Sequence, residues 1–212
     1  MIFLDYDGTL VDFNEKPDLA IPDAKLLQLI DALCALPNTD VAMVSGRDQA
    51  FLDKWFASLP VTLVAEHGHY VKRKGGEWMG TASSTKDWMA DVMPIFETFT
   101  DRTPGTFVEE KHNSLVWHYR KTDPELASGR VVEIKTVLSS LISDKLTILD
   151  MDKALEVVDR QVNKGSAVFE INSQGAYDFT LCIGDDVTDE NMFVSLPEHA
   201  YTIKVGRKPT SA

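Results

Sequence analysis

The chain has 212 residues, of which 44% are hydrophobic and 25% are charged, an ordinary composition for a water-soluble globular protein. Its net charge of −12 argues against a general nucleic-acid binder and against a protein that binds anionic membranes. No apolar run approaches transmembrane length, no leader precedes the first predicted strand, and both cysteines lie in apolar segments, so we expect a reduced, cytoplasmic protein with no membrane or nucleic-acid partner.

Most of the chain alternates segments typical of strands with segments typical of helices. The strands are predicted at residues 2–6, 40–46, 61–68, 178–186 and 201–206. The helices between them are predicted at residues 23–36, 48–59, 164–174 and 189–196. Such alternation is typical of βαβ units, so we expect an α/β fold with a Rossmann-like parallel sheet core and helices on both faces.

The middle of the chain follows another order, in which each helix precedes two short strands. The elements are a helix at 85–99, strands at 106–111 and 114–120 joined by a turn at 112–113, a helix at 125–142, and strands at 145–151 and 154–159. This order is typical of an α+β domain. We therefore expect an inserted domain at 81–156 within a core made of residues 1–80 and 157–212.

Polar side chains follow four of the predicted parallel strands where each strand ends. They belong to the segments DYDGT, SGR, EHG and GDDVTDE. Ligands of an open parallel sheet bind beyond the carboxyl ends of its strands, which predicts a binding site at this edge. Glu66, His67 and Gly68 would line its entrance, although a hydrogen-bonded core histidine explains His67 equally well.

Five carboxylates would meet at this edge, namely Asp5, Asp7, Asp185, Asp186 and Asp189. Carboxylates this close repel one another unless a cation neutralises them, and oxygen ligands favour a hard ion such as Mg²⁺. A solvated turn is the simpler explanation for Asp5 and Asp7 alone. An acidic helix N-cap explains GDDVTDE about equally well. Together the two motifs favour a metal site.

Two further features suggest an anionic ligand. Ser45, Gly46 and Arg47 lie between a strand and a helix, where backbone N–H groups and a hydroxyl bind phosphate. Lys164 begins a helix, where its charge opposes the helix dipole unless an anion lies nearby; alone, it is better explained as a surface lysine. A metal, anion-binding side chains and paired aspartates together predict phosphoryl transfer.

Each of these groups has a role in such a reaction. Asp5 would attack phosphorus and form an aspartyl-phosphate. Asp7 would protonate the departing alcohol oxygen and then take a proton from the water that hydrolyses the intermediate. Mg²⁺ and Lys164 would neutralise the phosphoryl oxygens while the carboxylate approaches.

The segments DYDGTL, VSGR, the lysine of NKG and GDDVTDE resemble, in this order, the four motifs of the haloacid dehalogenase superfamily of phosphatases. The resemblance implies that Asp5, the backbone carbonyl of Asp7 and Asp185 bind the metal. It implies that Asp186 and Asp189 orient the metal or its waters. It also implies that Ser45 and Lys164 hold the phosphoryl group.

Within this superfamily the chain is most similar to the trehalose-6-phosphate phosphatase family. The similar segments are AEHG, DRTPGTFVEEK, SLVWHYR, DPEL, GDDVTDE and YTIKVG. The resemblance implies a Mg²⁺-dependent hydrolysis of the sugar phosphate trehalose 6-phosphate, with a trehalose-phosphate synthase domain or subunit as a partner. The same chemistry on another sugar phosphate, such as sucrose phosphate, and a non-catalytic sugar-phosphate sensor are the alternatives.

The inserted strands carry a candidate substrate-binding face. By the two-residue period of a strand, Glu109 and Lys111 share one face, as do His118 and Arg120 on the next strand. A solvated face with cross-strand ion pairs is the simpler explanation of this pattern. The family resemblance favours sugar binding by these residues and by Glu156, although the sequence around Glu156 departs from the family's usual pattern.

Overall fold

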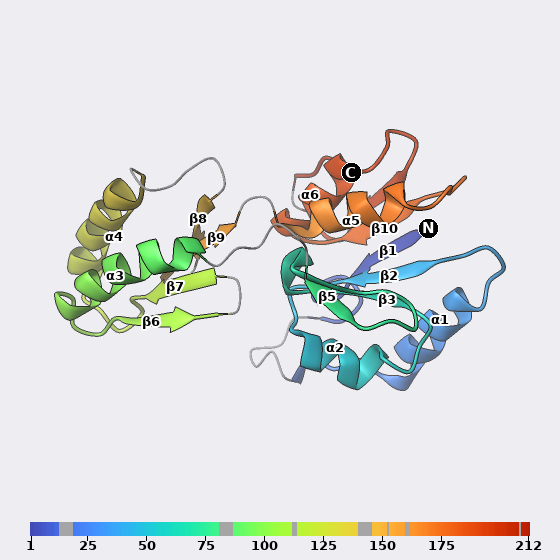
Figure 1. Cartoon of the computed structure of the whole chain (residues 1–212), viewed down its shortest axis with the longest axis horizontal. Coiled ribbons are helices and arrows are strands. Elements are labelled where there is room, and N and C mark those ends of the chain that lie inside the picture. The colour runs from blue at the N-terminus through green and yellow to red at the C-terminus, as the bar shows by residue number, and fades with distance from the viewer. Residues whose placement is uncertain are drawn as a thin grey trace. The chain divides into compact units, whose positions relative to one another are not determined.

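The computed structural model describes residues 1–12, 19–80, 87–111, 114–139, 146–151, 153–159, 162–207 and 209–212. The chain forms two compact units, one made of Met1–Ala82 with Val162–Ala212 and the other of Ser83–Gln161 (Figure 1). The second unit is therefore inserted into the sequence of the first. The boundary expected at residue 81 and the turn expected at 112–113 lie outside the described residues.

The first unit is built on a seven-stranded sheet in the order β11-β10-β1-β2-β3-β4-β5. Its parallel strands are β1 (Ile2–Asp5), β2 (Val41–Val44), β3 (Thr62–Ala65), β10 (Leu181–Gly184) and β11 (Tyr201–Lys204). β1 lies between β10 and β2, and Phe3 is the register partner of both Cys182 and Ala42. Every residue of β2 is buried, as expected for a parallel strand covered on both faces. The predicted parallel α/β core is confirmed.

Two antiparallel strands, β4 (Tyr70–Lys72) and β5 (Trp78–Gly80), extend this sheet beyond β3 and were not predicted. Each has three residues, which is too short to show a two-residue alternation. A side-chain contact adds to this backbone pairing, because the amine of Lys72 and the indole N–H of Trp78 both donate to the carboxylate of Asp53, each at 2.8 Å.

Helices cover both faces of the sheet (Figure 1). They are α1 (Ala24–Cys34), α2 (Gln49–Phe56), α5 (Lys164–Ser173) and α6 (Val187–Ser195). Alternate strand residues divide between two cores, so that Phe3 packs with α5 and α6 while Leu4 packs with α1 and α2. α1 and α2 each begin one residue after the predicted start, because Asp23 and Asp48 are N-caps whose carboxylates accept backbone N–H groups.

The second unit consists of one antiparallel sheet and two helices. Its elements are α3 (Asp87–Asp101), β6 (Phe107–Glu110), β7 (Ser114–His118), α4 (Pro124–Ser139), β8 (Leu146–Met151) and β9 (Ala154–Asp159). The sheet order is β6-β7-β9-β8. Leu115 and Trp117 of β7 are fully buried in a core that includes Phe96 of α3 and Ile134 of α4. One face of the sheet therefore packs on both helices, in agreement with the predicted order of elements.

Among the described residues, no helix combines the length and the apolar character that crossing a membrane requires.

Candidate active site

The carboxyl ends of three adjacent strands of the first unit bring the predicted catalytic residues together. Asp5 is the last residue of β1, Ser45 directly follows β2, and Asp185 directly follows β10. Because β10, β1 and β2 are neighbours in the sheet, these residues lie along one edge. Asp5 and Ser45 are buried, with 3% and 0% of their surface exposed.

Lys164 connects two of the aspartates at this edge. It is the first residue of α5, and its amine donates to Asp5 Oδ1 at 2.6 Å and to Asp189 Oδ1 at 2.7 Å. The exposed fractions of the three side chains are 4% for Lys164, 4% for Asp5 and 0% for Asp189. A surface lysine is therefore the wrong explanation for Lys164. Its charge compensates two carboxylates that would be very costly to bury alone.

Burial and neighbouring charges shift the pKa values of Asp5 and Lys164. Burial raises the pKa of Asp5 to about 6, since the loss of hydration outweighs the attraction of Lys164. Burial alone would lower the pKa of Lys164, but Asp5 and Asp189 raise it. The lysine thus stays protonated, and a further positive charge near Asp5 would lower the pKa of its carboxyl group again.

One oxygen of Asp5 is left for such a charge. Asp5 Oδ2 is buried, and among the described residues it has no hydrogen-bond partner. Carboxylate oxygens of Asp5, Asp185 and Asp189 all lie within 4.8 Å of one another. Three carboxylates around a buried acceptor that lacks a donor form the donor set that Mg²⁺ prefers, so these residues fit the predicted ion.

Two of the predicted metal residues, Asp186 and Asp189, also shape the start of α6. Asp186 is the N-cap of α6, as the alternative explanation of GDDVTDE expects. Asp189 takes part in the same helix start, because its Oδ2 accepts the backbone N–H groups of Asp185 and Asp186, each at 2.9 Å. The motif therefore serves both purposes: it begins a helix and it presents Asp185 and Asp189 to Asp5.

The turn after β1 is held close to Asp185. Gly8 has a φ of +84°, and a side-chain carbon there would collide with the Asp185 carboxylate. The Thr9 hydroxyl donates to Asp185 Oδ1 at 3.4 Å. The glycine of DYDGT is therefore required both for its backbone conformation and for space.

The Ser45–Arg47 loop differs from the predicted phosphate cradle at Arg47. The Ser45 hydroxyl oxygen accepts the backbone N–H of Arg47 at 3.1 Å. The Arg47 guanidinium, however, donates to both oxygens of Asp7, from Nε at 2.7 Å and from Nη2 at 2.5 Å. The side chain of Asp7 is therefore bound to Arg47, and Arg47 is engaged with a carboxylate of the protein.

The EHG segment forms a short 3₁₀ turn, η2 (Glu66–Gly68), that supports the Ser45–Arg47 loop. The backbone N–H of Glu66 donates to the Arg47 carbonyl at 2.9 Å, and that of His67 donates to the Ser45 carbonyl at 3.0 Å. The His67 ring lies against Gly46, where a side-chain carbon would come within 2.5 Å of His67 Nε2. Glu66 and His67 have φ values of +48° and +57°, a strained conformation that costs about 1–3 kcal/mol per residue.

In the second unit, the predicted sugar-binding residues form two cross-strand clusters. Glu156 accepts the Ser114 hydroxyl at 2.6 Å and the Lys111 amine at 3.3 Å. His118 Nε2 lies 2.7 Å from Glu109 Oε2. Register places these residues on the face opposite Leu115 and Trp117. The cross-strand contacts that the simpler explanation expects are therefore present on this face, and sugar binding stays a prediction.

Arg120 lies outside this face. The strand predicted at 114–120 ends at His118, because the N–H of Tyr119 donates to the Lys153 carbonyl at 3.0 Å and the chain then turns. Arg120 is exposed in that turn. The two-residue strand period that placed it beside His118 does not extend to it.

Two polar residues that contact the predicted site residues were missed, one in each unit. Ser114 is one, and a single serine at a strand start gives no signal in the sequence. Lys204 is the other: its side chain is 7% exposed, its amine donates to the Asp185 carbonyl, and it lies 3.6 Å from Glu190. Lys204 is the last residue of β11 and the register partner of Gly184, so the strand-end rule could have identified it.

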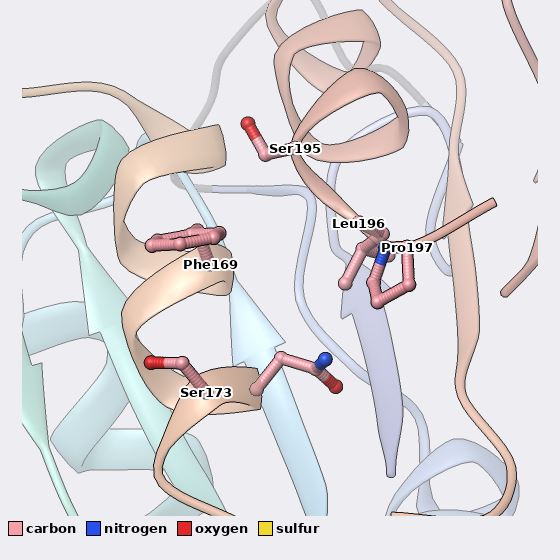
Figure 2. A pocket seen from close by; sticks show the side chains of 6 residues that line it. Phe169, Ser173, Ser195, Leu196 and Pro197 are labelled. Atoms are coloured by element: carbon pink, nitrogen blue, oxygen red, sulfur yellow. The ribbon is translucent and has the colours of Figure 1, made fainter.

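A separate hollow lies between α5 and the end of α6 (Figure 2). The residues that line it are Phe169, Asn172, Ser173, Ser195, Leu196 and Pro197. None of them carries a titratable side chain, so this hollow has no group for acid–base or nucleophilic chemistry. The chemistry-bearing side chains of the first unit gather instead around Asp5.

Comparison with known proteins agrees with this geometry. A family model described as Trehalose-phosphatase matches residues 3–212. The chain is 44% identical over 213 residues to a bifunctional trehalose-6-phosphate synthase/phosphatase of Thermoproteus tenax, a match that covers 100% of the chain and 29% of that relative. It is 38% identical over 220 residues to a trehalose-phosphatase of Saccharomyces cerevisiae, covering 92% of the chain and 25% of that relative. The chain thus spans less than a third of the length of these curated relatives.

A solved structure gives the same result over most of its length. The chain matches an Aspergillus fumigatus trehalose-6-phosphate phosphatase with a TM-score of 0.82 and 36% identity, over 100% of this chain and 85% of that one. The family resemblance inferred from the motifs is confirmed. The chain belongs to the trehalose-phosphatase family.

Proposed function

We propose that this chain is a Mg²⁺-dependent phosphatase that hydrolyses trehalose 6-phosphate to trehalose and phosphate through an aspartyl-phosphate on Asp5. The observation that carries the proposal is the buried Lys164–Asp5–Asp189 cluster. A lysine that holds one oxygen of a buried carboxylate, while the other oxygen has no partner among the described residues, suits a nucleophile rather than a structural ion pair.

The proposed reaction has two steps. In the first, an Asp5 oxygen attacks phosphorus, the bond to the ester oxygen breaks, and Asp7 gives that oxygen a proton, which releases trehalose. In the second, water attacks the phosphorus of the aspartyl-phosphate, Asp7 takes its proton, and phosphate leaves with Asp5 restored. Ser45 and Lys164 hold the phosphoryl oxygens through both steps.

Asp5, Asp185 and Asp189, with the backbone carbonyl of Asp7, would hold Mg²⁺, and Asp186 would support them from the start of α6. Bound there, the ion neutralises negative charge between the carboxylates and the phosphoryl group. The protein contributes the fixed positions of these oxygens, since Lys164 orients Asp5 and the backbone N–H groups of Asp185 and Asp186 orient Asp189. Lys204 fixes the carbonyl of Asp185 in the same way.

The second unit supplies substrate selection in this proposal. Its helix-free sheet face carries Lys111, Glu109, His118 and Glu156, which offer the donors and acceptors that sugar hydroxyls require. The first unit alone carries the phosphoryl chemistry. Glu66 and His67 support the Ser45–Arg47 loop, a role that their backbone hydrogen bonds favour over sugar contact, and Gly68 completes the same turn.

Two alternatives remain outcomes of experiment. The same chemistry could act on another sugar phosphate, such as sucrose phosphate, and a sensor could have kept the fold without turnover. A sensor needs no nucleophile, and the intact cluster around Asp5 argues against it. The similarity to a protein named as a bifunctional synthase/phosphatase supports a trehalose-phosphate synthase domain or subunit as partner. Location in the cytoplasm stays a prediction.

The function is tested by phosphate release from a panel of sugar phosphates. With Mg²⁺, we expect turnover of trehalose 6-phosphate at a kcat/KM at least about 100-fold above those for sucrose phosphate and glucose 6-phosphate, an energy difference of about 2.7 kcal/mol. With EDTA in place of Mg²⁺, release should stop. Faster turnover of sucrose phosphate than of trehalose 6-phosphate would show that sucrose phosphate is the better substrate. No turnover of any sugar phosphate in the panel would favour the non-catalytic sensor.

Replacing Glu156 tests the role of the second unit. Glu156→Gln removes the negative charge to which Lys111 and Ser114 donate hydrogen bonds. We expect KM for trehalose 6-phosphate to rise about tenfold, which corresponds to about 1.4 kcal/mol of binding. The kcat/KM for 2,4-dinitrophenyl phosphate, which has no sugar, should stay unchanged. Glu133→Gln on the exposed surface of α4 is the matched control. Equal losses on both substrates would contradict sugar recognition by Glu156.

A further inference from the structure

Arg47 makes a bidentate contact with Asp7, yet the proposed reaction gives Arg47 no role. Nε of Arg47 donates to Asp7 Oδ2 at 2.7 Å, and Nη2 donates to Asp7 Oδ1 at 2.5 Å. The two side chains are 12% and 26% exposed, so the pair is largely shielded from water. Two parallel hydrogen bonds between planar groups fix the plane of the carboxylate as well as its position.

Arg47 is itself held from several sides. Its guanidinium carbon lies 4.5 Å from the ring centroid of Phe51, and 5.9 Å from that of Tyr6. Its backbone N–H donates to Ser45 Oγ and its carbonyl accepts the N–H of Glu66. An arginine anchored by an aromatic ring and at both backbone groups is suited to orient a partner, since little of its own conformational freedom remains.

The same contacts argue against phosphate as the ligand of Arg47. The Nε and Nη2 edge, which is the edge best suited to bind a phosphoryl group bidentately, already binds Asp7. Lys164 and Ser45 remain as the groups at the strand ends for the phosphoryl oxygens. The predicted anion-binding role of Arg47 therefore needs a different account.

We propose that Arg47 is a positioning residue that fixes the carboxyl group of Asp7 for proton transfer to the ester oxygen. This proposal rests on the proposed function. In the first step the P–O bond breaks, its electron pair stays on the ester oxygen, and protonated Asp7 passes its proton to that oxygen to form the alcohol. The carboxylate that remains on Asp7 accepts both guanidinium donors, as in this structure, until it takes a proton from water in the second step. Proton transfer is sensitive to the direction of the carboxyl group, and the guanidinium sets that direction.

The proposal predicts that the effect of Arg47 depends on the leaving group. The sugar oxygen of trehalose 6-phosphate needs a proton as it departs, because an alkoxide is a poor leaving group. Dinitrophenolate departs as a stable anion and needs none. A residue that acts through Asp7 therefore matters for the first substrate only, whereas a residue that binds the phosphoryl group matters for both.

The test compares kcat/KM for the two substrates in Arg47→Ala and Arg47→Lys, since kcat/KM reports the steps up to formation of the aspartyl-phosphate. For trehalose 6-phosphate we expect Arg47→Ala to lower kcat/KM by about 100-fold, within the range of general acid catalysis, and Arg47→Lys by about tenfold or more because an ammonium cannot bind both oxygens in one plane. For 2,4-dinitrophenyl phosphate both variants should lose less than about fivefold.

Arg73→Ala is the matched control, since Arg73 lies on the surface with Gln174 and Glu170 as its neighbours. It should leave both substrates unchanged. The thermal unfolding midpoints show whether each variant is folded. Arg47→Lys keeps the positive charge next to Asp7, so it provides the test if Arg47→Ala does not fold.

A double-mutant cycle gives the second measurement. If Arg47 acts through Asp7, adding Arg47→Ala to Asp7→Asn should lower kcat/KM for trehalose 6-phosphate by less than about threefold further. Equal losses on the two substrates, or a further loss of about tenfold or more in the Asp7→Asn background, would overturn the proposal. Turnover of trehalose 6-phosphate by the unmodified protein is measured first. If the unmodified protein shows no turnover, the proposed function fails; if it shows turnover, the variants test the role of Arg47 alone.

Discussion

Asp5→Asn is expected to abolish hydrolysis of trehalose 6-phosphate while the protein remains folded. Asparagine has nearly the same shape and keeps an oxygen that accepts the Lys164 amine, but its amide does not attack phosphorus. We expect kcat to fall by at least about 10⁴-fold, as for other nucleophiles whose removal leaves only binding and electrostatic effects. The measurement is phosphate release at saturating substrate and Mg²⁺.

The stability of Asp5→Asn should stay the same or rise, although its activity is lost. Because burial raises the pKa of Asp5 to about 6, ionising it at pH 7 costs folding free energy in the metal-free protein. Asparagine removes that cost, so in EDTA at pH 7 the unfolding midpoint should equal or exceed that of the unmodified protein. Asp31→Asn, at an exposed position of α1, is the control for activity. Turnover retained by Asp5→Asn would remove Asp5 as the nucleophile.

Lys164→Met is expected to cause the largest loss of stability of any single substitution at the site. Methionine fills a similar volume but leaves Asp5 and Asp189 buried without their shared cation. Removing one partner from a buried ionic cluster typically costs about 3–5 kcal/mol. Urea unfolding in EDTA measures this loss, and activity should be lost with it, since Lys164 also holds the phosphoryl group in the proposed reaction.

Two further variants make the Lys164 result specific. Lys25→Met, at an exposed position of α1, should leave the free energy of unfolding unchanged within about 0.5 kcal/mol. Asp5→Asn combined with Lys164→Met should recover part of the lost stability, because one of the two unpaired carboxylates is gone. An unfolding free energy for Lys164→Met equal to that of the unmodified protein would show that the cluster does not depend on the lysine charge.

Local patterns were sufficient to predict the fold and the strand ends. Four-residue apolar strands that alternate with amphipathic helices leave little choice but a parallel sheet with helices on both faces. In that arrangement the carboxyl ends of adjacent strands meet at one edge, so the sequence alone groups Asp5, Ser45 and Asp185. The order helix, hairpin, helix, hairpin likewise predicted the architecture of the second unit.

Contacts that depend on side-chain conformation were not predictable. The sequence places Arg47 near a phosphate-binding loop, but whether its guanidinium binds a ligand or Asp7 depends on rotamers and on the ring of Phe51. Lys204 of β11 reaches Asp185 at the end of the neighbouring strand β10, and Lys72 of β4 contacts Asp53 of α2. Arg120 was placed by a strand period beyond the point where the strand ends. Several of these contacts involve a partner remote in the sequence, such as Asp7 for Arg47 and Asp185 for Lys204.

The central position of β1 has a consequence for how the protein acquires its structure during synthesis on the ribosome. β1 is made before the other strands of its sheet, but one of its two neighbours, β10, is made only after the whole of the second unit. The second unit is contiguous in sequence and can complete its own core earlier. Until Leu181–Gly184 has left the exit tunnel, one edge of β1 keeps unpaired backbone N–H and C=O groups, with which a strand of another chain can pair.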